Sequence, residues 1–198
     1  MKKMKSKLIS NIIFYLVIIL MGSYIIINAF MPTRVIDIFG FQGMPVLTPS
    51  MDPKIKVNDY IIITDVNPSK LEKDDIISFY TYLPTTTGGF SRQIVTHYVY
   101  DVIEDENGRY FQTYSELKDV NDNPVVDEWE NTQGDVLIRD EDIIGLYQFR
   151  IPLLGGAIMF IQNIFQNPIM LVLIIVNITV IVVLIKYILK KPKEEEQK

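Results

Sequence analysis

Residues 94–103 read Ile-Val-Thr-His-Tyr-Val-Tyr-Asp-Val-Ile, a run rich in β-branched and aromatic residues with clear alternation. This composition and a period of two are typical of a β-strand. The run ends at an acidic turn, Glu104–Gly108, and residues 109–114 return in the same style, which predicts a hairpin-like pair. The first strand of the pair carries His97, the only histidine in the chain.

The same strand pattern recurs on both sides of this pair, separated by turns such as Asn67–Ser69 and a flexible loop at Thr85–Gly89. The further predicted strands are residues 57–64, 74–82, 136–138 and 143–149. No long soluble helix is indicated among them. The sequence therefore predicts a mainly β domain, either a barrel or two packed sheets.

Residues 151–161 form an apolar segment that is too short to span a membrane. Two interpretations are open for it. It could be a core strand, or it could be an apolar patch that lies on the membrane surface beside the second apolar run.

Two longer apolar runs enclose the β segment. Residues 8–30 contain no charged side chain over 23 positions, and about 20 apolar residues suffice for a membrane-spanning helix. A second helix of this kind is predicted over residues 169–189. The first run could instead be a cleaved signal peptide, but it is longer than the usual apolar region and no small-x-small cleavage site follows closely. We therefore expect two retained transmembrane helices.

Lysines flank both runs on the sides that face the chain ends. They are Lys2, Lys3, Lys5 and Lys7 before the first run, and Lys186, Lys190, Lys191 and Lys193 at the end of the second. The positive-inside rule then places residues 1–7 and the charged tail 190–198 in the cytoplasm. Residues 31–168 become an extracytoplasmic domain, in which 31–41 link it to the membrane and Pro32 marks the helix end. The localisation that fits best is a bacterial plasma membrane, because the chain lacks cysteine.

Composition excludes several kinds of site. Without cysteine the chain has no disulfide, zinc-thiolate site or cysteine nucleophile, and one histidine makes a protein-built zinc site improbable. Residues 31–168 hold 10 Lys and Arg against 21 Asp and Glu, a net charge of −11. A nucleic-acid partner is not expected, since phosphate recognition needs a basic surface. We expect no metal and no cofactor.

The stretch Thr48-Pro49-Ser50-Met51-Asp52-Pro53 places one serine in a turn bounded by prolines, and it begins less than twenty residues after the first apolar run. A serine hydroxyl is a weak nucleophile and needs a base within hydrogen-bond reach. A histidine base in turn needs a carboxylate to orient it. Ser50 and His97, with a downstream acidic residue, could supply all three groups.

The serine stretch resembles the Ser-Met-x-Pro box of type I signal peptidases, which also follows an N-terminal membrane span. Val95-Thr96-His97, 47 residues after the serine, resembles the histidine box of the endoplasmic-reticulum-type branch. That branch uses serine and histidine where the common bacterial enzymes use serine and lysine. Lys70 and Lys73 are the nearest candidates for a lysine base, and neither lies on a strand in the serine–lysine pattern.

Further boxes of the family follow in the same order and extend the resemblance over about residues 10–165. Asp59 with the strand behind it resembles the family's Gly-Asp-hydrophobic step, with Asn58 where glycine is usual. Residues 74–79 resemble its Gly-Asp-Ile/Val-x-x-Phe strand. Residues 151–155 resemble the Ile-Pro-x-x-Gly stretch that closes its catalytic domain.

The acidic box is the least similar. Glu116 stands where the family has the first of two Asp residues, and Asp122 follows six positions later. The resemblance assigns the role of orienting His97 to Asp122, with Glu116 as its rival and Asp119 as a third option.

The oxyanion hole departs from the family at Pro49, where glycine is usual, because proline has no N–H to donate. The Ser50 N–H and the Thr48 hydroxyl are then the candidate donors to the developing oxyanion.

The resemblance implies a signal-peptidase-like (LexA-like) β domain between two transmembrane helices. It implies a membrane-bound serine endopeptidase that removes signal peptides from exported preproteins, with the lipid bilayer and the secretion machinery as further partners. The alternative is a catalytically inactive two-span protein whose β domain binds partner proteins. An extracytoplasmic sensor is a third hypothesis, against which the short cytoplasmic ends count.

Overall fold

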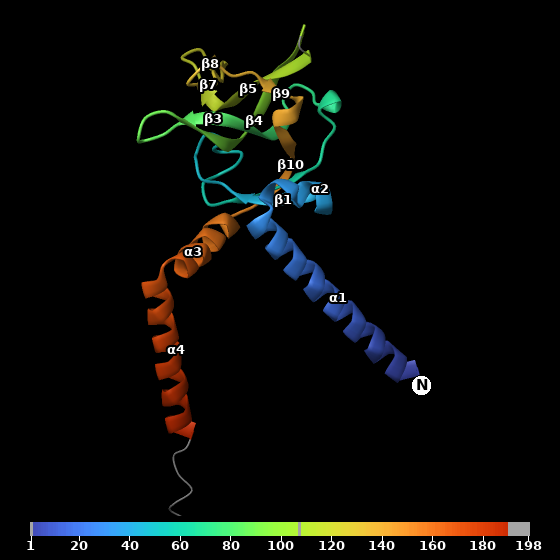
Figure 1. Ribbon diagram of the computed structural model, residues 1–198, viewed down its shortest axis with the longest axis vertical. Helices are drawn as coiled ribbons and strands as arrows, with labels where there is room; N and C mark the ends of the chain where they lie inside the picture. The colour runs from blue at the N-terminus through green and yellow to red at the C-terminus, as the bar shows by residue number, and fades with distance from the viewer. Residues whose placement is uncertain (1, 107, 190–198) are drawn as a thin grey trace, which may run out of the picture. The chain divides into compact units, whose positions relative to one another are not determined.

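The computed structural model describes residues 2–106 and 108–189. The protein is mainly antiparallel β-sheet with an apolar helix near each end of the chain (Figure 1). Two compact units divide at Gly155 and Gly156, within helix α3 (Leu154–Gln166). The predicted charged tail, residues 190–198, lies outside the described residues, and so does Asn107 in the predicted acidic turn.

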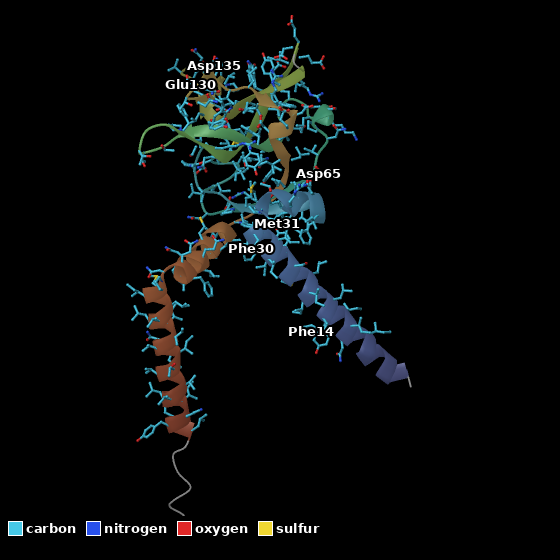
Figure 2. The ribbon with its side chains drawn as sticks, viewed as in Figure 1. Phe14, Phe30, Met31, Asp65, Glu130 and Asp135 are labelled. Carbon is cyan, nitrogen blue, oxygen red and sulfur yellow. The ribbon has the colours of Figure 1, made fainter. Side chains whose placement is uncertain are left out.

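Helices α1 (Lys2–Phe30) and α4 (Pro168–Leu189) contain the two predicted spans. Their apolar parts, Ile9–Phe30 and Pro168–Leu189, are each 22 residues long, with mean hydropathies of 2.4 and 3.1, and their most apolar stretches contain no buried residue. Side chains project from α1 on all sides, including Phe14 and, at its end, Phe30 (Figure 2). A helix that is apolar all round and unburied suits a lipid environment, so both helices could cross a membrane.

The main sheet is antiparallel, with the strand order β1-β2-β10-β3-β4-β5-β6 and β9 added to β5. Its strands are β1 (Phe41–Pro45), β2 (Tyr60–Thr64), β3 (Ile76–Pro84), β4 (Phe90–Asp105), β5 (Gly108–Lys118), β6 (Pro124–Val126), β9 (Ile138–Arg139) and β10 (Ile143–Ile151). A separate two-stranded sheet joins β7 (Glu130–Asn131) to β8 (Gly134–Asp135). Short helices η1 (Pro32–Arg34), α2 (Val35–Phe39), η2 (Pro68–Lys70) and η3 (Asp140–Asp142) fill connections.

Every strand predicted from the sequence overlaps an observed one, and the mainly β class is confirmed. The predicted link at residues 31–41 also contributes to the core, because α2 buries Val35 completely and Ile36 almost completely. Of the two interpretations left open for residues 151–161, the core strand is wrong, because the chain turns after Ile151 and then forms α3.

Apolar residues gather on both faces of the strands. On β3, Ile76 belongs to one cluster and Ile77 to the other, as expected when successive side chains point to opposite faces. The first cluster includes Met51 and Ile55, which are 2% and 1% exposed. These two side chains anchor the loop that carries Ser50 against the sheet.

A buried carboxylate holds the far end of the same loop. Asp59 is 2% exposed and accepts hydrogen bonds from Arg150 Nη1 at 2.6 Å, the Lys56 N–H at 2.9 Å and the Leu153 N–H at 3.3 Å. Burial alone would raise the pKa of Asp59, but these hydrogen bonds outweigh it and hold the pKa below its ordinary value. Gly155 packs so closely here that a Cβ would lie 2.1 Å from the Asp59 carbonyl oxygen. Asp59 therefore joins the serine loop to the end of β10.

Asn58 has a φ of 71°, in the left-handed region that glycine and asparagine tolerate and β-branched residues do not. We expect Asn58→Gly to leave the free energy of unfolding nearly unchanged and Asn58→Val to lower it by about 1–2 kcal/mol. Urea unfolding in detergent, followed by the fluorescence of Trp129, the only tryptophan, measures both. Equal stability of the two variants would contradict the assigned backbone conformation.

Candidate active site

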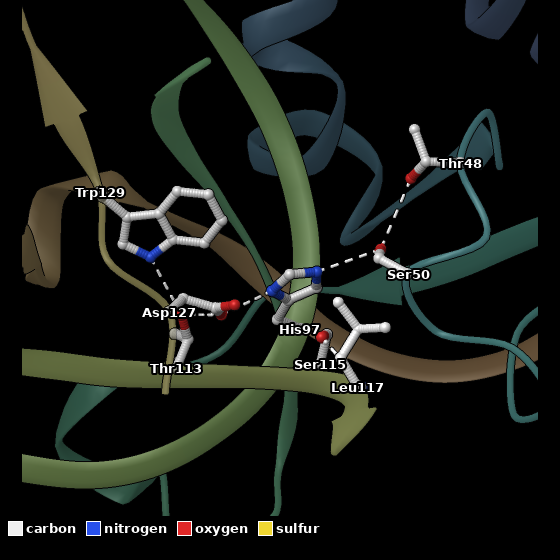
Figure 3. Close-up of polar contacts among 8 residues, drawn as sticks. All are labelled: Thr48, Ser50, His97, Thr113, Ser115, Leu117, Asp127 and Trp129. Atoms are coloured by element: carbon white, nitrogen blue, oxygen red, sulfur yellow. Dashed lines mark hydrogen bonds and ion pairs between the residues drawn. The ribbon is translucent and has the colours of Figure 1, made fainter. Parts of the chain in front are cut away.

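Ser50 and His97 lie next to each other, as the sequence predicted. Ser50 belongs to the loop between β1 and β2, and His97 lies on β4 opposite Ile77 of β3. The Ser50 Oγ is 3.1 Å from His97 Nε2 (Figure 3). The His97 residue is only 5% exposed, so the sheet fixes the position of the imidazole.

The other ring nitrogen of His97 contacts Asp127, which follows β6. His97 Nδ1 lies 2.6 Å from Asp127 Oδ2, and the two side chains are 7% and 14% exposed. The Thr113 hydroxyl donates to the same oxygen at 2.7 Å, and Trp129 Nε1–H donates to the Thr113 hydroxyl at 3.0 Å. Figure 3 shows this row of contacts running from Trp129 to Ser50.

The donors and acceptors in this row can be arranged in one direction. Trp129 Nε1–H can only donate, so the Thr113 oxygen accepts from it and gives its own proton to Asp127. An ionised Asp127 only accepts, so His97 carries its proton on Nδ1. Nε2 of the neutral ring is then an acceptor for the Ser50 hydroxyl proton. The arrangement can remove a proton from Ser50 and keep the resulting imidazolium beside a carboxylate.

The carboxylate assignment made from the sequence is corrected here, because Asp127 and not Asp122 contacts His97. The Asp122 side chain is 81% exposed and pairs with Lys118 Nζ at 2.8 Å. It lies in the turn between β5 and β6, where its φ is 65°.

The two rival carboxylates also have other partners. Glu116 Oε1 accepts from the Tyr98 hydroxyl at 2.7 Å, and burial together with this bond raises the pKa of Tyr98. Asp119 accepts from the backbone N–H of Asn123 at 2.9 Å and of Asn121 at 2.8 Å, and these bonds lower the pKa of Asp119. Glu116 still contributes to the site through its backbone, because its N–H donates to the Ser50 carbonyl oxygen at 3.0 Å.

The residues predicted to form the oxyanion hole lie around the serine. Thr48 Oγ1 is 3.5 Å from Ser50 Oγ, at the long limit of a hydrogen bond. The Ser50 N–H meets no acceptor within the described part of the chain. The Pro49 carbonyl accepts from the Asp52 N–H and closes the turn. One free backbone donor and one nearby hydroxyl are therefore available beside the Ser50 oxygen.

The two lysines considered as an alternative base do not replace His97. Lys73 Nζ lies 5.1 Å from the centre of the Tyr100 ring, and Lys70 ends η2. Among residues 2–106 and 108–189, no group of three or more His, Asp or Glu side chains is arranged to hold a metal ion.

No protein-family model matches this sequence, and a search of curated proteins returns no match. The fold and the site therefore define only a general class. The chain is a mainly β protein with two helices that could cross a membrane, and it aligns a serine, a histidine and an aspartate in hydrogen-bonding order.

Proposed function

We propose that the protein is a membrane-bound serine endopeptidase of the type I signal peptidase class, in the branch that uses serine and histidine. The observation that carries this proposal is the row Ser50–His97–Asp127, with separations of 3.1 Å and 2.6 Å. A triad is recognised by its geometry and by the roles of its members rather than by residue order. The substrates are exported preproteins that carry N-terminal signal peptides.

The proposed mechanism relies on the observed contacts of His97 with Ser50 and with Asp127. His97 Nε2 takes the proton of the Ser50 hydroxyl while Oγ attacks the carbonyl carbon of the last residue of the signal peptide. Asp127 stabilises the imidazolium. The peptide C–N bond breaks as His97 returns the proton to the leaving amine, which leaves an ester on Ser50. Water, activated by His97, then hydrolyses the ester and releases the signal peptide.

The oxyanion that forms during attack needs donors aimed at its own position. The Ser50 N–H, which has no acceptor among the described residues, can donate, and the Thr48 hydroxyl is the second candidate. Pro49 supplies no N–H, so the Thr48 hydroxyl contributes more to stabilising the oxyanion than it would in a member of the resembled family with glycine at that position.

Backbone conformation supports the resemblance at positions away from the site. Asn58 and Asp74 stand where the resembled family has glycine, and both have positive φ values, of 71° and 70°. Gly155 stands where the family has glycine in its closing stretch, and a Cβ there would clash with the Asp59 carbonyl. At each of these three positions, where the resembled family has glycine, there is thus a physical reason for glycine or for a residue that accepts a positive φ.

The sheet also offers a place for an extended substrate. β1 is a terminal strand of the sheet, and the chain leads from its end at Pro45 directly to Ser50. A peptide that adds itself to this edge would bring its backbone to the serine by main-chain hydrogen bonds. In this proposal the β domain faces the outside of the plasma membrane, both chain ends lie in the cytoplasm, and the secretion machinery delivers the preprotein.

Co-expression with a panel of preproteins tests the function. We expect the chain to convert precursors to mature forms whose N-termini follow a small residue, and the Ser50→Ala chain to leave them uncut. N-terminal sequencing of the products identifies the cleaved bond. Cleavage that persists with Ser50→Ala, or the absence of cleavage by the unaltered chain, overturns the proposal.

Pro49 favours a second candidate, an inactive two-span protein whose β domain binds partners, because it removes one backbone donor beside the serine. The same co-expression panel separates the two candidates. The inactive protein would bind preproteins or secretion components equally well with serine or alanine at position 50 and would cut none.

A further inference from the structure

A tyrosine inside the first apolar helix reaches the edge of the sheet. Tyr24 belongs to α1, and its hydroxyl oxygen accepts a hydrogen bond from the Gly43 N–H of β1 at 3.2 Å. Its ring stacks on Phe41 at 5.5 Å and meets Phe39 edge-on at 5.2 Å. Figure 1 shows the C-terminal end of α1 beside β1.

The Gly43 N–H belongs to the free edge of the sheet. Within the described part of the chain β1 pairs with β2 alone, and in an antiparallel strand the N–H groups point alternately toward and away from the neighbouring strand. Because Gly43 donates to Tyr24, its N–H points away from β2. Pro45, two positions on, faces the same edge and has no N–H to offer.

Few outward donors remain between Gly43 and the serine. The Val46 N–H is used internally, by the Asp59 carbonyl oxygen at 2.9 Å. Leu47 is therefore the next residue that faces the free edge, and Pro49 again lacks an N–H. Since Pro45 has no N–H, the Gly43 N–H is the next outward donor after Leu47 for a peptide running along β1 away from Ser50, and Tyr24 occupies it.

The ring of a second tyrosine, Tyr60, covers the face of the sheet at Gly43. The Tyr60 ring lies where a Cβ on Gly43 would be, with its nearest atom at 2.3 Å from that position. Burial, with the adjacent Tyr24 hydroxyl as a smaller cause, raises the pKa of Tyr60 to about 12. The edge at Gly43 is thus enclosed by aromatic side chains, which suit an apolar segment better than a polar one.

We propose that Tyr24 is a specificity-determining residue that ends the pairing of the substrate with β1, so that the peptide leaves the sheet at Gly43. The inference rests on the proposed function. The peptide segment before the scissile bond pairs along the edge between Ser50 and Pro45, and the apolar run of the signal peptide begins where Tyr24, Phe39 and Phe41 gather.

The position of Tyr24 within α1 is consistent with a peptide that leaves the sheet at Gly43. It lies six residues before Phe30, which is about 9 Å along a helix at 1.5 Å per residue. A peptide that leaves β1 beside Tyr24 therefore enters the layer spanned by α1. Six residues, 44–49, separate Gly43 from Ser50, and paired strands advance at nearly equal rates. The preferred spacing between apolar run and cleaved bond is then about five or six residues.

The test uses the full-length chain in membranes and a series of preproteins in which this spacing grows one residue at a time. Tyr24→Phe keeps the ring but releases the Gly43 N–H. We expect the spacing cleaved fastest to lengthen by about two residues, the repeat of outward-facing positions on a strand. Tyr15→Phe, in the same helix and exposed, is the matched control and should keep the original optimum.

A binding measurement separates this inference from the proposed function. In Ser50→Ala chains with ¹⁵N-labelled glycine, adding an uncleaved signal peptide should move the Gly43 amide resonance only when Tyr24→Phe is also present. Cleavage with no spacing optimum, an optimum unchanged by Tyr24→Phe, or a Gly43 shift with Tyr24 intact overturns the inference alone. A chain that neither binds nor cleaves any preprotein overturns both.

Discussion

Asp127→Asn is expected to lower the rate of preprotein cleavage by about 10⁴-fold, because an amide either lacks the charge that stabilises the imidazolium or holds His97 in the wrong tautomer. Asp127 Oδ2 accepts from His97 Nδ1 at 2.6 Å and from the Thr113 hydroxyl at 2.7 Å. An asparagine that keeps both contacts through its oxygen has no negative charge with which to stabilise the imidazolium. An asparagine turned the other way donates to Nδ1 and forces the His97 proton onto Nε2.

Asp122→Asn is the matched control, and we expect its cleavage rate to stay within about twofold of the unaltered chain. Its carboxylate is exposed and pairs with Lys118, and exposed pairs of this kind contribute little. Single-turnover cleavage of a purified preprotein measures both rates, and the Trp129 emission shows that each variant is folded. A large loss with Asp122→Asn and none with Asp127→Asn would refute the structural assignment.

The strands and two of the three site residues could be predicted because their signals are local. A period of two over residues 94–103 indicates a strand wherever the chain folds, and the observed β4 contains all of it. Ser50 and His97 each lie in short motifs that can be recognised without knowing which strands pair. The sheet order, by contrast, places β10 between β2 and β3, and no local pattern specifies that insertion.

Asp127 was missed because its position depends on the geometry of one hairpin. The turn between β5 and β6 folds back on Asp119, which accepts the N–H groups of Asn121 and Asn123. The register shifts along this pair, and the Asp127 N–H then donates to the Thr113 carbonyl at 2.8 Å. Counting six residues from Glu116 reaches the turn itself. The available signal was the short apolar pair Val125–Val126, a strand that would have carried the next acidic residue to β5.

The sequence pattern also does not predict that residues 31–45 form a partly buried helix and an edge strand. Val35 and Ile36 are too few to show helical periodicity, yet α2 buries both. β1 reads Phe-Gln-Gly-Met-Pro, with glycine and proline that argue against a strand interior. At the edge of a sheet these residues are allowed, and Gly43 is required there by the Tyr60 ring.

Asp59→Asn is expected to lower the free energy of unfolding at neutral pH by about 2 kcal/mol, less than the roughly 3–5 kcal/mol typical of breaking a fully buried ion pair, because Arg150 is partly exposed. The change leaves Arg150 without its carboxylate partner at 2.6 Å and weakens the contacts to the Lys56 and Leu153 N–H groups. Asp65→Asn is the matched control, because Asp65 is exposed in the loop after β2 (Figure 2). Urea unfolding of the three chains in detergent measures the differences.

The pH dependence makes the Asp59 prediction specific to its charge. The pKa of Asp59 is lowered in the folded protein, so its ionised form stabilises the fold at pH values above the unfolded pKa of about 3.9. That contribution is lost as the pH falls through the folded pKa. The difference between the unaltered chain and Asp59→Asn should therefore be constant from pH 7 to about pH 5 and shrink below about pH 4. A difference that stays the same in acid would mean that Asp59 stabilises the loop by its shape and hydrogen bonds and not by its charge.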